Sequence, residues 1–130
     1  MAKNGVFRNI FKVGPFRESF RIAIQGIVYL FLYHRNMRII FLAGVGAMLM
    51  GIRLQLRGIE LAVLCLTITA VFVAEIFNTA IEMIIDMSIR KYHTLIKLVK
   101  DIAAAVVLIT SVNSIAVGII LFWPKLFKRF

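Results

Sequence analysis

The sequence has few acidic residues, a single cysteine and no glycine-rich phosphate loop. Six Asp and Glu residues stand against 16 Lys and Arg residues, which gives a formal net charge of +10. One cysteine, Cys65, excludes an intramolecular disulfide, and its place within an apolar run is typical of a small buried hydrophobe. Gly44, Gly46 and Gly51 are followed by no Gly-Lys-Ser/Thr, so they are expected to serve helix packing rather than a Walker-type nucleotide site.

Hydrophobic residues make up most of what remains. They account for 62% of the 130 residues, and the mean hydropathy is +0.94, whereas soluble domains are about 45–50% apolar. A single domain of this length, residues 1–130, cannot bury so much apolar surface in water. The bilayer is therefore the expected solvent. Because the basic residues border the apolar runs, membrane phosphates are the expected partner and nucleic acid is not.

Three apolar stretches predict an all-α membrane protein with three transmembrane helices. They cover about residues 39–56, 59–89 and 102–123. A span needs about 20 residues, so the first is barely long enough, and the last turns of the second should emerge among the headgroups. Residues 16–33 place apolar side chains on one helical face and polar ones on the other. This pattern predicts an amphipathic surface helix, although packing against the bundle is an alternative.

The distribution of Lys and Arg predicts the orientation in the membrane. Seven lie in the N-terminal part and four between the second and third spans, against two in the other connection and three in the tail. Positive residues favour the cytoplasmic side. The N-terminus is therefore expected in the cytoplasm.

Residues 74–86 of the second span carry half of the acidic residues of the chain. Glu75, Asn78, Glu82 and Asp86 fall within an arc of roughly 80° on one helix face. An ionised side chain inside a span costs on the order of 2.5–3.5 kcal/mol, so this acidic stripe needs compensation from cations, metal or protons. Contacts between helices are the structural alternative, but Asn or Ser would serve there at lower cost.

The depth of each group in the second span suggests its task. Glu75 lies deepest, where the loss of solvent favours a general base. Glu82 lies two turns nearer the cytoplasm, where a carboxylate can hold Mg²⁺ together with nucleotide phosphate oxygens. Lys100 and Asp101 open the third span from the same side. Lys100 is a cation suited to bind a phosphate.

These residues resemble the prokaryotic diacylglycerol kinase family of small trimeric lipid kinases, which includes the undecaprenol kinases of Gram-positive bacteria. The similarity runs from Ser19 to Trp123 and is most specific at Ala-Glu-Ile-Phe-Asn-Thr-Ala-Ile-Glu, residues 74–82. The family's spacing continues through Asp86, Tyr92-His93 and Lys100-Asp101. The segments that favour the undecaprenol kinase branch are Arg35-Asn36-Met37-Arg38-Ile39 and Gly58-Ile59-Glu60.

The resemblance implies a homotrimer in the bacterial cytoplasmic membrane that uses ATP and Mg²⁺ to phosphorylate a lipid alcohol, with undecaprenol favoured over diacylglycerol. It implies that Glu75 is the catalytic base, supported by Asn78, and that Glu82 binds the metal. Lys100 would contact phosphate. The remaining positions carried over, all near the nucleotide, are Asp86, Tyr92, His93 and Asp101.

One position departs from the family pattern. His34 stands where the family places a second metal-binding glutamate, and imidazole is a poorer Mg²⁺ ligand than carboxylate. An altered metal site, a direct contact of His34 with phosphate, and a weakened kinase all fit this change. Lys91 also replaces an acid of the nucleotide loop. Two functions from other classes remain open, a proton- or cation-conducting oligomer and a structural membrane subunit.

Overall fold

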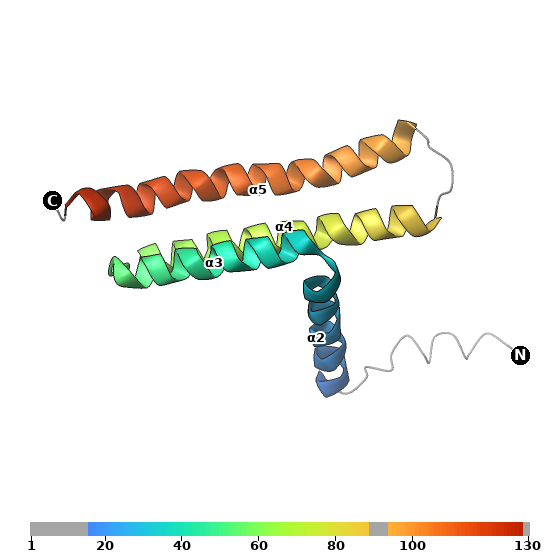
Figure 1. Ribbon diagram of the computed structural model, residues 1–130, viewed down its shortest axis with the longest axis horizontal. Helices are drawn as coiled ribbons and strands as arrows, with labels where there is room; N and C mark the ends of the chain where they lie inside the picture. The colour runs from blue at the N-terminus through green and yellow to red at the C-terminus, as the bar shows by residue number, and fades with distance from the viewer. Residues whose placement is uncertain (1–15, 89–93, 129–130) are drawn as a thin grey trace, which may run out of the picture. The chain divides into compact units, whose positions relative to one another are not determined.

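The computed structural model describes residues 16–88 and 94–128 of the chain. Within these ranges it contains four helices and no strand (Figure 1). The helices are α2 (Phe16–Tyr33), α3 (Arg35–Arg53), α4 (Ile59–Ser88) and α5 (Thr94–Phe127). The last three are each long and apolar enough to cross a membrane. The prediction of an all-α protein with three candidate spans is confirmed, whereas the trimer and the surface position of α2 stay predictions.

The chain divides into two compact units, residues 1–34 and 35–130, each of which is described by itself. Helix α2 belongs to the first unit and has no buried residue. Its end is ordered by aromatic contacts, because the ring of Tyr29 lies 4.7 Å from that of Tyr33 and 6.2 Å from that of His34. The His34 N–H also donates to the Leu30 carbonyl at 2.9 Å. His34 thus sits directly after α2 with a defined backbone position.

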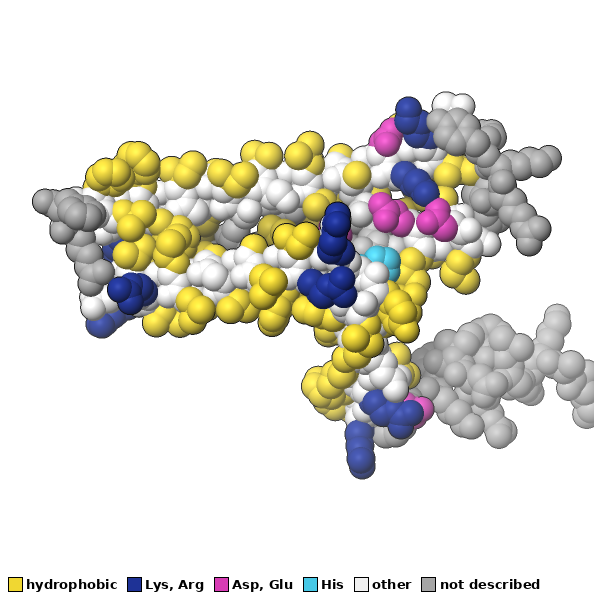
Figure 2. Space-filling view, in the orientation of Figure 1, with side chains coloured by type: hydrophobic (Ala, Val, Ile, Leu, Met, Phe, Trp, Pro, Cys, Tyr) yellow, Lys and Arg dark blue, Asp and Glu magenta, His cyan; other side chains and the backbone are white. Residues whose placement is uncertain are grey.

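In the second unit, α4 lies between α3 and α5 and packs against both (Figure 1). Two ion pairs join the ends of α4 to α5 in antiparallel register, Glu60 to Lys125 at 2.9 Å and Asp86 to Lys100 at 2.6 Å. A small core lies at the Glu60 end. It is formed by Leu56, Leu64 and Phe122. Figure 2 shows hydrophobic side chains along much of this unit, as expected for a bundle surrounded by lipid. Charged side chains lie toward its ends, and further Lys or Arg side chains lie where α3 begins.

The three spans differ in length, and this difference exposes part of α4. At 1.5 Å per residue, the 19 residues of α3 extend about 28 Å and the 30 residues of α4 about 45 Å. The ring of Phe41 meets that of Phe72 edge-on at 6.2 Å, which sets the antiparallel register of α3 on α4. Counting from this contact, the first turn of α3 reaches the level of Glu75 and Asn78. The last turns of α4 extend beyond α3.

Helix α3 ends at Arg53, earlier than the apolar run that continues to Leu56 suggests. The Leu56 N–H donates to the Gly51 carbonyl at 2.9 Å, and the Gln55 N–H donates to the Ile52 carbonyl at 3.0 Å. These two bonds form a Schellman motif, in which the residue after the cap adopts a left-handed conformation. Here that residue is Gln55, with φ at 57°. The motif turns Leu56 into the core and stops the helix.

Two of the three α3 glycines allow the backbone of α3 to approach α4 closely. A Cβ atom on Gly51 would lie 2.7 Å from Leu64 Cδ2, and one on Gly44 would lie 2.9 Å from Ile68 Cγ2. Small residues at such positions bring transmembrane helices together. The packing role is wrong for Gly46 within the protomer, since among the described residues no atom beyond the nearby backbone of α3 and its chain neighbours lies within 4 Å of its Cβ position.

We expect Gln55→Gly to stabilise the protein by about 1 kcal/mol, because glycine adopts the left-handed conformation without the Cβ penalty. Thermal unfolding of the protein in detergent measures this gain. Gln55→Ala is the matched control, since it removes the same side chain but retains the Cβ. Equal melting temperatures for the Gly and Ala variants would contradict the strain at this turn.

Candidate active site on α4 and α5

The polar stripe of α4 passes from the protein interior to the open surface. Glu75 is only 4% exposed, Asn78 and Glu82 are half-buried, and the side chain of Asp86 is 66% exposed. Along the helix axis, Glu75 and Asp86 are separated by about 16 Å. The stripe therefore places one carboxylate in an apolar environment and another in the polar region at the end of the same helix.

Asn78 and Glu82 contact each other in the middle of the stripe. The Asn78 Nδ2 donates to the Glu82 Oε1 at 3.3 Å. The Oδ1 of Asn78 is buried and has no hydrogen-bond partner among the described residues. A buried acceptor left without a donor costs about 1–3 kcal/mol. This oxygen is therefore suited to accept a hydrogen bond from a hydroxyl group or to contact a cation.

Lys100 links α5 to the exposed end of the stripe. Its Nζ donates to Asp86 Oδ1 at 2.6 Å, and Glu82 lies close enough to interact with it electrostatically. The sequence predicts Lys100 as a phosphate contact, and the structure adds that the ammonium group is held by a carboxylate on the neighbouring helix. An exposed ion pair contributes at most about 1 kcal/mol. Lys100 can thus exchange its Asp86 partner for a phosphate at little cost.

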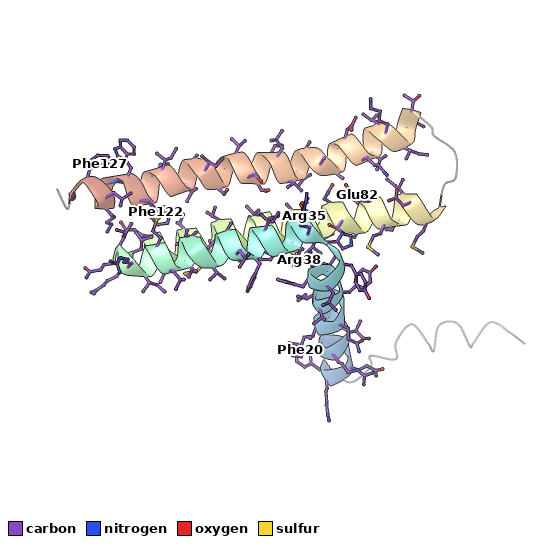
Figure 3. The ribbon with its side chains drawn as sticks, in the orientation of Figure 1. Phe20, Arg35, Arg38, Glu82, Phe122 and Phe127 are labelled. Atoms are coloured by element: carbon purple, nitrogen blue, oxygen red, sulfur yellow. The ribbon has the colours of Figure 1, made fainter. Side chains whose placement is uncertain are left out.

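The start of α3 brings two arginines to the level of the stripe. By the register of α3 on α4, Arg38 lies level with Glu75 and Arg35 level with Asn78. Figure 3 labels both arginines at the first turn of α3, with Glu82 on α4. Guanidinium groups bind phosphate and carboxylate oxygens in a fixed fork geometry. In the sequence, Arg35 and Arg38 stand out only because their segment resembles the undecaprenol kinase branch. Their position beside the stripe could not be predicted, because it depends on the register of α3 on α4.

The donors at this site fit a metal that arrives with a nucleotide. Within residues 16–88 and 94–128, no group of three or more His, Cys, Asp and Glu side chains converges. Glu82 and the Asn78 Oδ1 supply oxygen atoms, which Mg²⁺ prefers, and phosphate oxygens commonly complete its shell. The set matches a metal–nucleotide complex better than a resident ion.

Of the other predicted site residues, one lies on α5, one belongs to the first unit and two lie outside the described residues. Asp101 is exposed on α5, next to Lys100. His34 belongs to the first unit, so its predicted role beside Glu82 stays a prediction. Tyr92 and His93 lie outside the described residues.

Comparison with known proteins identifies the family of this chain. The family model for prokaryotic diacylglycerol kinase matches residues 21–122. A diacylglycerol kinase from Synechocystis sp. is 38% identical over 127 residues, covering 96% of this chain and 73% of that protein. An undecaprenol kinase from Bacillus subtilis is 35% identical over 115 residues, covering 88% of this chain and 94% of that protein. The chain belongs to the prokaryotic diacylglycerol kinase family and is a bacterial multi-pass membrane lipid kinase.

Proposed function

We propose that the protein transfers the γ-phosphoryl group of Mg²⁺-ATP to the hydroxyl of a membrane lipid alcohol at the cytoplasmic face of the bacterial inner membrane. The exposure gradient from Glu75 to the Asp86–Lys100 pair carries this proposal. A lipid hydroxyl can approach from the apolar end of the stripe and a nucleotide from its polar end. The excess of Lys and Arg on the N-terminal part and the second loop supports the cytoplasmic assignment.

In this proposal Glu75 is the general base. The lipid hydroxyl oxygen forms a bond to the γ-phosphorus, the bond from that phosphorus to the β–γ bridging oxygen breaks, and ADP leaves. The hydroxyl proton passes to the Glu75 carboxylate. Asn78 lies one turn away, and its unpaired Oδ1 can accept a hydrogen bond that orients the reacting groups. Positioning and charge neutralisation supply most of the catalysis in phosphoryl transfer.

Lys100 and Glu82 would hold the nucleotide. Lys100 binds a phosphate oxygen after leaving Asp86, and Asp86 keeps the ammonium group in place when no phosphate is bound. Glu82 contributes one ligand to the Mg²⁺ that accompanies ATP. That ion, when bound, neutralises charge on the transferred phosphoryl group. Asp101, Tyr92 and His93 complete the proposed nucleotide surface.

Undecaprenol is the favoured acceptor. The two similar proteins are named for different acceptors, diacylglycerol and undecaprenol, at nearly equal identity. The preference therefore comes from the segments that resemble the undecaprenol kinase branch, residues 35–39 and 58–60.

A homotrimer is the proposed assembly. A largely apolar cavity of about 330 Å³ lies between the spans of the second unit. Small residues line it on both sides, including Ala43, Gly44 and Ala47 on α3 and Gly118 on α5. Such residues allow a helix from a second copy to approach closely, which supports the assembly implied by the family resemblance.

We expect Glu75→Gln to preserve the folded oligomer and lower kcat by about 10²–10⁴-fold, because the amide keeps the shape of the side chain but cannot take the proton. Transfer of labelled phosphate from ATP to undecaprenol and to diacylglycerol measures this effect. Glu60→Gln, which removes a carboxylate from the opposite end of α4, is the control and should retain activity. Near-normal turnover of Glu75→Gln would refute the base assignment.

We expect Lys100→Met to lower kcat/KM for ATP by about 10- to 100-fold while leaving KM for the lipid unchanged, since a charge-assisted hydrogen bond contributes about 1.5–3 kcal/mol. Initial rates with each substrate varied in turn separate the two effects. Lys97→Met removes the same charge one turn earlier on α5 and should change KM for ATP little. A variant of Lys100 that binds ATP normally would exclude the phosphate contact.

If His34 is part of an altered metal site, His34→Glu should lower the Mg²⁺ concentration needed for half-maximal activity, because carboxylate is the better Mg²⁺ ligand. Activity measured across Mg²⁺ and Mn²⁺ concentrations reports the change. Asn36→Glu, which adds the same charge two residues later, controls for general attraction of cations. A metal dependence identical to that of the wild type would rule out the altered-metal interpretation.

A further inference from the structure

The end of the bundle opposite the candidate active site carries a basic hollow. It has a volume of about 150 Å³ and lies between the end of α3 and the end of α5. Its lining consists of Arg53, Leu54, Gln55, Lys125 and Lys128. At about 30 Å³ per water molecule, it has room for about five water-sized groups, comparable to a phosphate group.

The charge around this basic hollow is not balanced by the protein's acidic side chains. Glu60 is the one Asp or Glu between residues 19 and 74, and no Asp or Glu follows Asp101. Glu60 pairs with Lys125 at 2.9 Å. Arg53 and Lys128 add two further positive charges at the same opening. The net positive potential favours an anion.

Stabilisation of helix ends does not account for the convergence of these residues. A cation near a helix C-terminus interacts favourably with the helix dipole, and this explains Arg53 on α3 and Lys125 on α5 separately. It does not require two different helices to direct their cations into one hollow. A phosphate or carboxylate group does require such convergence, since each of its oxygen atoms needs its own donor.

Aromatic and apolar residues place the basic hollow at the level of lipid headgroups. Trp123 is 61% exposed, and its ring lies 4.5 Å from that of Phe127, which Figure 3 labels at this end of α5. Exposed Trp side chains mark the membrane–water interface. Ile119 and Ile120, together with Trp123 and Pro124, line a shallow apolar depression on the same turns of α5. This apolar surface lies within two turns of Lys125 along α5, so the basic hollow lies at the depth where acyl chains meet headgroups.

The backbone around the hollow is fixed before any ligand arrives. The Schellman motif at Gln55 holds the end of α3, and the Lys128 N–H donates to the Pro124 carbonyl at 3.2 Å. The Glu60–Lys125 ion pair holds the start of α4 against α5. The backbone that carries the hollow is therefore held in place, while Arg53 and Lys128 reach into the hollow as exposed side chains.

We propose that this basic hollow binds the phosphate group of an anionic phospholipid, with Arg53 and Lys128 as its main ligands and Lys125 oriented by Glu60. The site is separate from the proposed phosphotransfer and uses none of its residues. It binds a structural lipid of the leaflet that surrounds this end of the bundle.

Trp123 is the single tryptophan of the chain and precedes Lys125 by two residues on α5, so its fluorescence reports on lipid at the level of the basic hollow. The protein is placed in phosphatidylcholine nanodiscs that contain either brominated phosphatidylglycerol or brominated phosphatidylcholine. Bromine on a bound acyl chain quenches the fluorescence. We expect stronger quenching by phosphatidylglycerol in the wild type. The double variant Arg53→Gln/Lys128→Gln should weaken phosphatidylglycerol binding by about thirtyfold, at about fivefold for each removed charge.

Two control variants distinguish a specific binding site from a general effect of positive surface charge. Arg57→Gln removes one charge from the same turn but not from the hollow, and should stay within about twofold of the wild type because salt screens charges that make no direct contact. Arg53→Lys should retain the preference, and circular dichroism confirms that every variant keeps its helices. Equal quenching by both lipids in the wild type, or an unchanged preference in the double variant, overturns the proposal. Loss of the preference on adding inorganic phosphate would assign the hollow to free phosphate instead.

Discussion

The burial of one carboxylate in a membrane-spanning helix is the constraint on which the arrangement of this kinase depends. Within the bilayer a helix satisfies its own backbone hydrogen bonds. The free-energy cost of inserting α4 therefore comes from its ionisable side chains. Glu75 is buried because α4 lies between α3 and α5. The first turn of α3 brings Arg38 to its level. Packing between the helices keeps this carboxylate only 4% exposed, away from the surface of the bundle.

The register of α4 against α5 likewise follows from the cost of placing charged side chains in the apolar region. The ion pairs Asp86–Lys100 and Glu60–Lys125 lie at opposite ends of the contact, where side chains reach the polar boundary. Each contributes little free energy by itself. A shift of α5 by one turn would nevertheless separate both pairs and leave charges near the apolar region. The two ion pairs therefore add little stability but disfavour other registers of α5 on α4. The register that they favour places Lys100 beside the acidic stripe.

The sequence predicts the elements of this protein better than their contacts. The three spans and the helix at residues 16–33 follow from hydrophobic period and length, and the acidic stripe follows from helical spacing. The end of α3 could not be predicted, because Gln55 occupies a left-handed position that usually carries glycine. Nor could the pairing of Lys100 with Asp86, because it depends on the register between two helices distant in sequence. The level of Arg35 and Arg38 was missed for the same reason.

The unequal spans give the two halves of the site different stiffness. Around Glu75 three helices pack together, whereas among the described residues of the second unit α4 and α5 alone continue to the level of Asp86. A two-helix arm has fewer lateral contacts and bends more easily than a three-helix core. Glu75, the proposed proton acceptor, therefore lies in the stiffer three-helix part of the bundle, and Lys100, the proposed phosphate ligand, lies in the two-helix part. In the proposed function, a nucleotide held by Lys100 and Glu82 would link α5 to α4 where these two helices have the fewest neighbours in the second unit.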